Sequence, residues 1–284
     1  MEAANEININ DLQIPYIGSV LSDQYNAFAC RIPETDQTII LLDGELFVLA
    51  SILSKIITLS LPKFKYFGNI AEFSTDKKII EKHIEENPEI TYRFKLLVYD
   101  YLYKKRAINY FEPDNRFTAF RWNLINSLEL FVVGHELGHI ISGHLEKSIT
   151  WIFNVNNINI TKICPNWENE YEADKIGVKL MLKAIEKNGQ LPFCYVGADL
   201  FFAFLNIHER AIALFSTGEE YNIINYNSHP PTKGRRDLIK NHINLNIIEK
   251  NIIIYNIFNE FIDNVIEVLW GKIKQKWKEL NCNN

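Results

Sequence analysis

Residues 128–139 read LELFVVGHELGH, an apolar run that leads directly into the pentapeptide HELGH at 135–139. The apolar run indicates a buried helix, and the pentapeptide has the H-E-x-x-H pattern. On a helix, side chains four residues apart share a face, so His135 and His139 can bind one metal ion. Glu136 lies about 100° further round the helix axis and can activate a water molecule at that metal.

The helix that carries HELGH is expected to begin near residues 115–118 and to continue to about Lys147. Its apolar stripe recurs at three- and four-residue intervals and consists of Phe120, Leu124, Leu128 and Phe131. The two histidines continue the same face. The metal is therefore expected at the edge of the hydrophobic core.

Chance alone rarely produces this pentapeptide, because the chain has only 7 histidines among its 284 residues. Two histidines and a glutamate are also costly to bury in a helix unless partners satisfy them. Both considerations favour a metal site over an incidental pattern.

The composition is that of an ordinary globular protein, with 47% hydrophobic and 23% charged residues. A chain of 284 residues can form one large or two modest domains with a substantial core. The net charge of −5 argues against nucleic acid or an anionic membrane surface as the main partner.

The chain is expected to be cytoplasmic and to have no membrane span. Residues 1–6 are acidic and polar and lack the basic and apolar regions of a signal peptide. Of the three most apolar stretches, 41–61 and 252–270 contain charged residues, and 195–207 is too short to cross a bilayer. No two cysteines form a C-x-x-C pair, and all of them lie far apart in the sequence. Free cysteines in a reducing compartment are therefore the simpler interpretation.

We expect a polar N-terminal segment over residues 1–22 and a single domain over 23–284, with the motifs within 115–240. Residues 26–32 and 38–42 flank a Pro-Glu-Thr-Asp turn sequence and predict a β-hairpin. The expected fold class is mainly α (α+β), with a small N-terminal β-hairpin or sheet.

Helices are predicted from apolar periodicity, caps and helix breakers. They cover residues 43–59, 77–85, 89–104, 167–187, 192–215 and 247–280, and a further helix is opened by Pro230 and Pro231. Residues 151–163 are rich in Asn and β-branched side chains and predict either a short strand pair or a loop.

A zinc site in a hydrolase needs three protein ligands and an open position for water. Glu170 is the best candidate for the third ligand, because it lies on a helix downstream of HELGH that can fold back. Asp174 lies one turn further on the same face and is expected to accept the free N–H of His135. Glu172 points about 200° away from Glu170 and is expected to be a surface carboxylate.

Two further histidines are weaker candidates. His144 lies five residues after His139, about 140° off the ligand face, and is interpreted as structural or at the surface. His229 precedes Pro230 and Pro231, which stiffen its backbone at a helix entry. Spacing alone favours an incidental histidine at that turn.

Three motifs in this order resemble the gluzincin peptidases of the HtpX and CAAX-prenyl-protease type. They are HELGH at 135–139, EYEADKIG at 170–177 and SHPPTKGRR at 228–236. Three ordered motifs are far more specific than one. The resemblance implies a helical zincin-like metallopeptidase.

The same resemblance implies a role for each matching residue. It implies His135, His139 and Glu170 as zinc ligands, Glu136 as the general base and His229 as a donor to the transition state. It also implies Asp174 as the partner of a ligand and a structural role for Arg235.

Most of those peptidases are embedded in membranes, whereas this chain has no convincing transmembrane helix. The likeness is therefore closer to soluble bacterial phage-exclusion proteins of the Lit type. That likeness implies a dormant cytoplasmic protease, switched on during phage infection, that cleaves the host translation factor elongation factor Tu.

The main hypothesis is a zinc-dependent endopeptidase acting on a protein or peptide substrate, with a phage-derived activator. The alternative is a non-catalytic metal-binding sensor or partner-binding protein, and a third hypothesis is a purely structural helical protein. Zinc is the default metal for two histidines and one glutamate, although manganese or cobalt suits such ligands too.

Overall fold

The computed structural model describes residues 13–21, 25–63, 65–67, 70–109, 111–113, 115–146, 149–155, 158–164, 166–188, 192–220, 230–247 and 249–281. Over these residues the fold is mainly α with a small β part, which confirms the expected fold class. Across the same residues, no helix combines the length and the apolar character that a bilayer crossing requires.

A small sheet forms near the N-terminus from β1 (Tyr16–Val20), β2 (Ala27–Arg31) and β3 (Thr38–Asp43), in the order β1-β3-β2. The antiparallel pairing of β2 with β3 confirms the predicted hairpin. β1 comes from the segment expected to be a polar extension and pairs with β3 in parallel. β2 therefore lies at one edge of this sheet, and four of its five residues are buried.

Two of the predicted helices have clear N-terminal caps. The carboxylate of Asp43 caps α2 (Gly44–Leu59) by accepting the Glu45 N–H at 3.0 Å. Asp76 caps α3 (Lys77–Glu86) in the same way. Both helices begin where the sequence predicted.

The single helix predicted over 89–104 has two parts. α4 (Pro88–Lys95) is followed without a break by the π-helix η1 (Leu96–Tyr103). Before α3, the short strands β4 (Lys65–Phe67) and β5 (Ile70–Glu72) pair antiparallel.

α5 (Thr118–Ile141) carries HELGH and follows the 3₁₀ turn η2 (Asn115–Phe117). The expected helix end near Lys147 is wrong. Gly143 adopts a left-handed conformation with φ of 65°, which stops the helix because the chain can no longer continue its right-handed turns. The 3₁₀ turn η3 (His144–Glu146) follows.

The Asn-rich stretch forms a strand pair rather than a loop, because β6 (Ile149–Val155) and β7 (Ile158–Cys164) pair antiparallel. α6 (Trp167–Lys187) has the predicted bounds, and the Asn166 side chain caps it. β7 runs beside the edge strand β2.

The C-terminal half consists of helices. A 3₁₀ turn, η4 (Pro192–Val196), leads into α7 (Gly197–Thr217). α8 (Thr232–Asn246) begins directly after the two prolines, as expected, and α9 (Glu249–Asn281) is the longest described helix.

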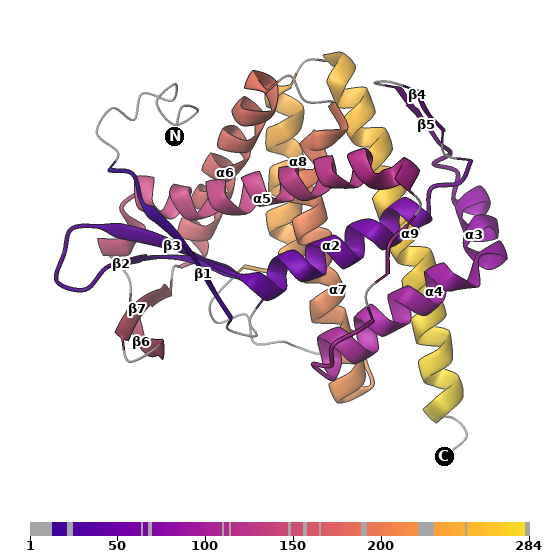
Figure 1. Cartoon of the computed structure of the whole chain (residues 1–284), viewed down its shortest axis with the longest axis horizontal. Coiled ribbons are helices and arrows are strands. Elements are labelled where there is room, and N and C mark those ends of the chain that lie inside the picture. Colours follow the sequence, from indigo (N-terminus) through magenta and orange to yellow (C-terminus); the bar gives the residue numbers. More distant parts are fainter. Residues whose placement is uncertain are drawn as a thin grey trace.

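α5 runs through the middle of the molecule, with the sheet at its C-terminal end and α9 on the opposite side (Figure 1). It packs against α6, α7 and α2. Its predicted stripe is confirmed, since all four residues are fully buried: Phe120, Leu124, Leu128 and Phe131. This core holds the HELGH end of α5 between α6 and the sheet.

Candidate metal centre

Small residues allow α5 and α6 to cross with their backbones in contact. A Cβ atom on Gly134 would lie 2.9 Å from the Gly177 carbonyl oxygen. A Cβ atom on Gly138 would lie 2.9 Å from the Ala173 carbonyl oxygen. A side chain larger than hydrogen does not fit at such distances, so these two positions of α5 require glycine. The close crossing brings the histidines of α5 against the acidic residues of α6.

His135 and His139 of α5 and Glu170 of α6 form one buried group whose atoms can converge on a metal ion. The Nε2 atoms of the two histidines lie 3.1 Å apart. Glu170 Oε2 lies 3.7 Å from His135 Nε2, and Glu170 Oε1 lies 3.5 Å from His139 Nε2. The fold therefore brings the three expected ligands together.

These separations suit a single metal ion. Ligand atoms bound about 2.0–2.1 Å from a tetrahedral zinc lie about 3.3 Å from one another. The observed separations of 3.1, 3.5 and 3.7 Å bracket that value. Two imidazoles and one carboxylate thus fit a divalent metal ion in both distance and ligand chemistry.

Asp174 lies against His135, as the sequence predicted. Its Oδ1 atom is 2.9 Å from His135 Nδ1, although the angle is poorer than that of an ideal hydrogen bond. Burial would lower the pKa of His135, but Asp174 and the charges of Glu170 and Glu136 raise it overall. Asp174 holds the Nδ1 side of the ring, which leaves Nε2 to face the metal.

Arg235 of α8 joins two buried acidic residues of α6, Asp174 and Glu170. It donates to Asp174 from Nε at 2.8 Å and from Nη2 at 2.7 Å, and its Nη1 lies 3.1 Å from Glu170 Oε2. Burial would raise the pKa of Asp174, but Arg235 and His135 lower it, so Asp174 is ionised at neutral pH. Arg235 thus connects Glu170, a candidate ligand, to Asp174, which contacts the candidate ligand His135.

The buried cluster contains more acidic than permanently basic side chains. Glu136, Glu170 and Asp174 supply three carboxylates, and Arg235 supplies one guanidinium. With neutral histidines, two negative charges are left over when all three acids are ionised. Buried charge without compensation is costly, and a divalent cation would balance it.

Glu136 is held by the edge strand of the sheet. The backbone N–H of Ala29 in β2 donates a hydrogen bond of 2.6 Å to Glu136 Oε2, and Glu136 is 5% exposed. Sequence reasoning missed Ala29, because a backbone N–H from a distant strand leaves no mark on residue identity. The sheet is therefore part of the site.

His144 is buried next to the site, so the surface alternative is wrong and the structural interpretation stands. Its Nδ1 atom lies 3.0 Å from His139 Nδ1, and its Nε2 atom lies 3.2 Å from Glu172 Oε2. The 140° estimate does not apply, because Gly143 ends the helix before His144. Burial lowers the pKa of His144 despite the neighbouring carboxylate. Glu172 is largely exposed, as expected, but it contacts His144.

His229, for which the resemblance implies a catalytic role, lies outside the described residues. The helix that it precedes is present as α8, and Pro230 is buried. Its assignment stays a prediction.

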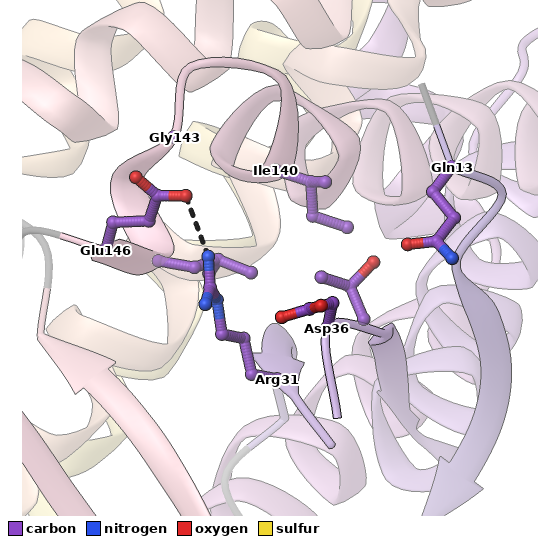
Figure 2. A pocket seen from close by; sticks show the side chains of 8 residues that line it. Gln13, Arg31, Asp36, Ile140, Gly143 and Glu146 are labelled. Carbon is purple, nitrogen blue, oxygen red and sulfur yellow. Dashed lines mark hydrogen bonds and ion pairs between the residues drawn. The ribbon is translucent and has the colours of Figure 1, made fainter. Parts of the chain in front are cut away.

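A polar cleft lies between the β2–β3 hairpin and the turn after α5 (Figure 2). Arg31, Asp36, Ile140 and Glu146 are among its lining residues. Arg31 Nη2 donates to Glu146 Oε1 at 2.7 Å, which ties β2 to η3. The lining does not include the three candidate ligands, so this cleft is not the metal centre.

No family model, curated protein or solved structure matches this chain. Its candidate function therefore rests on the geometry of the site and on the motif resemblance.

Proposed function

We propose that this chain is a zinc-dependent endopeptidase. The proposal is carried by the buried convergence of His135, His139 and Glu170 at ligand distances. Two imidazoles and one carboxylate form a ligand set of known zinc peptidases, which keep a fourth position for water. A structural zinc site would normally be closed by four protein ligands.

The roles of the chain's own residues follow from their positions. Bound zinc would act as a Lewis acid that activates water and polarises a peptide carbonyl. Glu136 would accept the proton of that water and pass it to the leaving amine. The Ala29 N–H orients Glu136 by binding one carboxylate oxygen. His229 would support the developing oxyanion, an assignment that depends on the motif resemblance alone.

The biological role that we propose is phage exclusion in the cytoplasm. A phage-derived activator would switch the protease on, and elongation factor Tu would be its substrate. This part depends on the resemblance to Lit-type proteins.

The enclosure of the site supports a second candidate, a metal-binding sensor or partner-binding protein without catalysis. Glu136 is 5% exposed, and the Ala29 N–H occupies one of its oxygens. A substrate carbonyl must approach this group for hydrolysis to occur. Against this candidate, a protein that only binds metal has no need of a base at Glu136.

Glu136→Gln separates the two candidates. The variant keeps the metal ligands and removes the base, so it should retain zinc and lose cleavage. Proteomes of cells expressing wild type or the variant, with and without phage challenge, provide the measurement. Glu129→Gln, on the same helix and away from the ligands, is the matched control and should cleave like wild type.

Cleavage by Glu136→Gln at the wild-type rate would show that the proposed mechanism is wrong. Stoichiometric zinc in both proteins, without any new protein fragments under phage challenge, would favour the sensor.

A further inference from the structure

Each candidate ligand on α5 has a partner for its second ring nitrogen. His135 Nδ1 lies against Asp174, and His139 Nδ1 lies against His144, whose far side contacts Glu172. We propose that His144 and Glu172 form a relay that positions His139 for metal binding. This inference rests on the metal site proposed above and adds two positioning residues to it.

The proton positions follow from the distances. A histidine that binds metal is neutral and coordinates through an unprotonated nitrogen. If His139 Nε2 faces the metal, its proton sits on Nδ1, which lies 3.0 Å from His144 Nδ1. His144 Nδ1 can accept a hydrogen bond from His139 Nδ1–H only if the proton of His144 sits on its Nε2 atom.

That second proton also has an acceptor. His144 Nε2 lies 3.2 Å from Glu172 Oε2, and an ionised carboxylate accepts hydrogen bonds but cannot donate them. One arrangement of protons therefore satisfies His139, His144 and Glu172 together. The carboxylate fixes the tautomer of His144, and His144 in turn fixes the tautomer and ring orientation of His139.

The fold around η3 places the relay. Gly143, with φ of 65°, turns the chain back so that His144 meets the helix it has just left. The Arg31–Glu146 ion pair of 2.7 Å attaches the same turn to β2. His144 is 3% exposed, so its ring is held by packing.

Glu172 offers the cleaner test, because its side chain is 57% exposed and its loss should not disturb the core. His144→Phe should bind zinc about 10- to 100-fold more weakly, as is typical when the partner of a ligating histidine is lost. Glu172→Ala should also weaken zinc binding by more than twofold but by less than His144→Phe, because Glu172 acts on the ligand through His144. Zinc affinity would be measured by competition with a chelator of known affinity. Glu168→Ala removes the same charge from an exposed position of the same helix and should bind like wild type.

Two readouts distinguish positioning from general structure. Glu172→Gln keeps a carbonyl oxygen that can accept from His144, so it should recover part of the affinity lost in Glu172→Ala. The visible absorption spectrum of the cobalt-loaded protein should change in His144→Phe and Glu172→Ala and stay unchanged in Glu168→Ala, because it reports the geometry around the metal.

The outcomes separate this inference from the metal site itself. If wild type binds one equivalent of zinc and both Glu172→Ala and His144→Phe bind within twofold of it, the relay is overturned while the site stands. If wild type binds no equivalent of zinc, the site fails, and the relay fails with it.

Discussion

Arg235 is the residue on which the acidic side of the centre depends. It is 4% exposed and pairs with both Asp174 and Glu170. Arg235→Met should lower the free energy of unfolding of the metal-free protein by about 3–5 kcal/mol, because it leaves two buried carboxylates without their cation. Urea unfolding in the presence of a chelator measures this change.

Lys233→Met provides the control for Arg235→Met. Lys233 is exposed on the same helix, so its loss should change the free energy of unfolding by less than about 0.5 kcal/mol. Equal stability of the two variants would contradict the described role of Arg235.

His208 predicts a pH dependence that is independent of the metal centre. Burial, with Lys105 nearby, lowers its pKa from 6.5 to about 4. The unfolded chain therefore binds a proton before the folded protein does, and stability falls as pH drops from 6.5 to 4. The free energy of unfolding should fall by about 3 kcal/mol more in wild type than in His208→Phe over this range.

Phenylalanine is the appropriate replacement for His208, because the ring packs against Tyr25 and Phe204. Urea unfolding at a series of pH values measures the difference between the two proteins. Parallel curves for wild type and His208→Phe would rule out a depressed pKa at His208.

Individual site residues could be predicted from the sequence where their spacing and chemistry are typical of a metal site. The positions of His135, His139, Glu170 and Asp174 follow from helical periodicity, and the structure brings them together. The partnership of His144 could not be predicted, because it depends on where the helix stops and not on its periodicity.

Among the structural elements, the α5–α6 crossing controls the centre most directly. Gly134→Ala should weaken zinc binding and lower the free energy of unfolding by about 1–3 kcal/mol, because its Cβ would lie 2.9 Å from the Gly177 carbonyl oxygen. Chelator competition and urea unfolding measure the two effects.

Gly271→Ala is the matched control for the helix crossing. Gly271 lies within α9, and an added Cβ would meet no atom within 4 Å. Alanine favours helix more than glycine does, so this variant should be more stable by about 0.5–1 kcal/mol. Unchanged zinc affinity in Gly134→Ala would show that the close crossing does not position the ligands.

Most helices could be predicted because their signals are local. The cap at Asp43 set the start of α2 correctly. The sequences Pro165-Asn166 and Asn188-Gly189 set the two ends of α6 correctly. Two features were not predictable from local signals. β1 joins the sheet through pairing with a strand that is distant in sequence, and α5 ends through a single left-handed glycine inside an otherwise helical pattern.

The whole molecule assembles the centre from distant parts of the chain. α5 and α6 supply the ligands, α8 supplies Arg235, and β2 supplies the Ala29 N–H to Glu136. Sequence motifs indicated the ligands on α5 and α6 and a structural role for Arg235 on α8. The contact between β2 and Glu136 arises only from the global fold. The three candidate ligands are buried among helices and the sheet, so the core positions the site and also limits access to it.

Metal content shows whether His135, His139 and Glu170 form a metal site. Wild-type protein, exposed to zinc and freed of loosely bound metal, should retain about one zinc ion per chain by elemental analysis, as a three-ligand site requires. His135→Ala, treated identically and shown to be folded, should retain far less. Absence of stoichiometric zinc from wild type, or equal zinc in wild type and His135→Ala, would show that these residues do not form a zinc site.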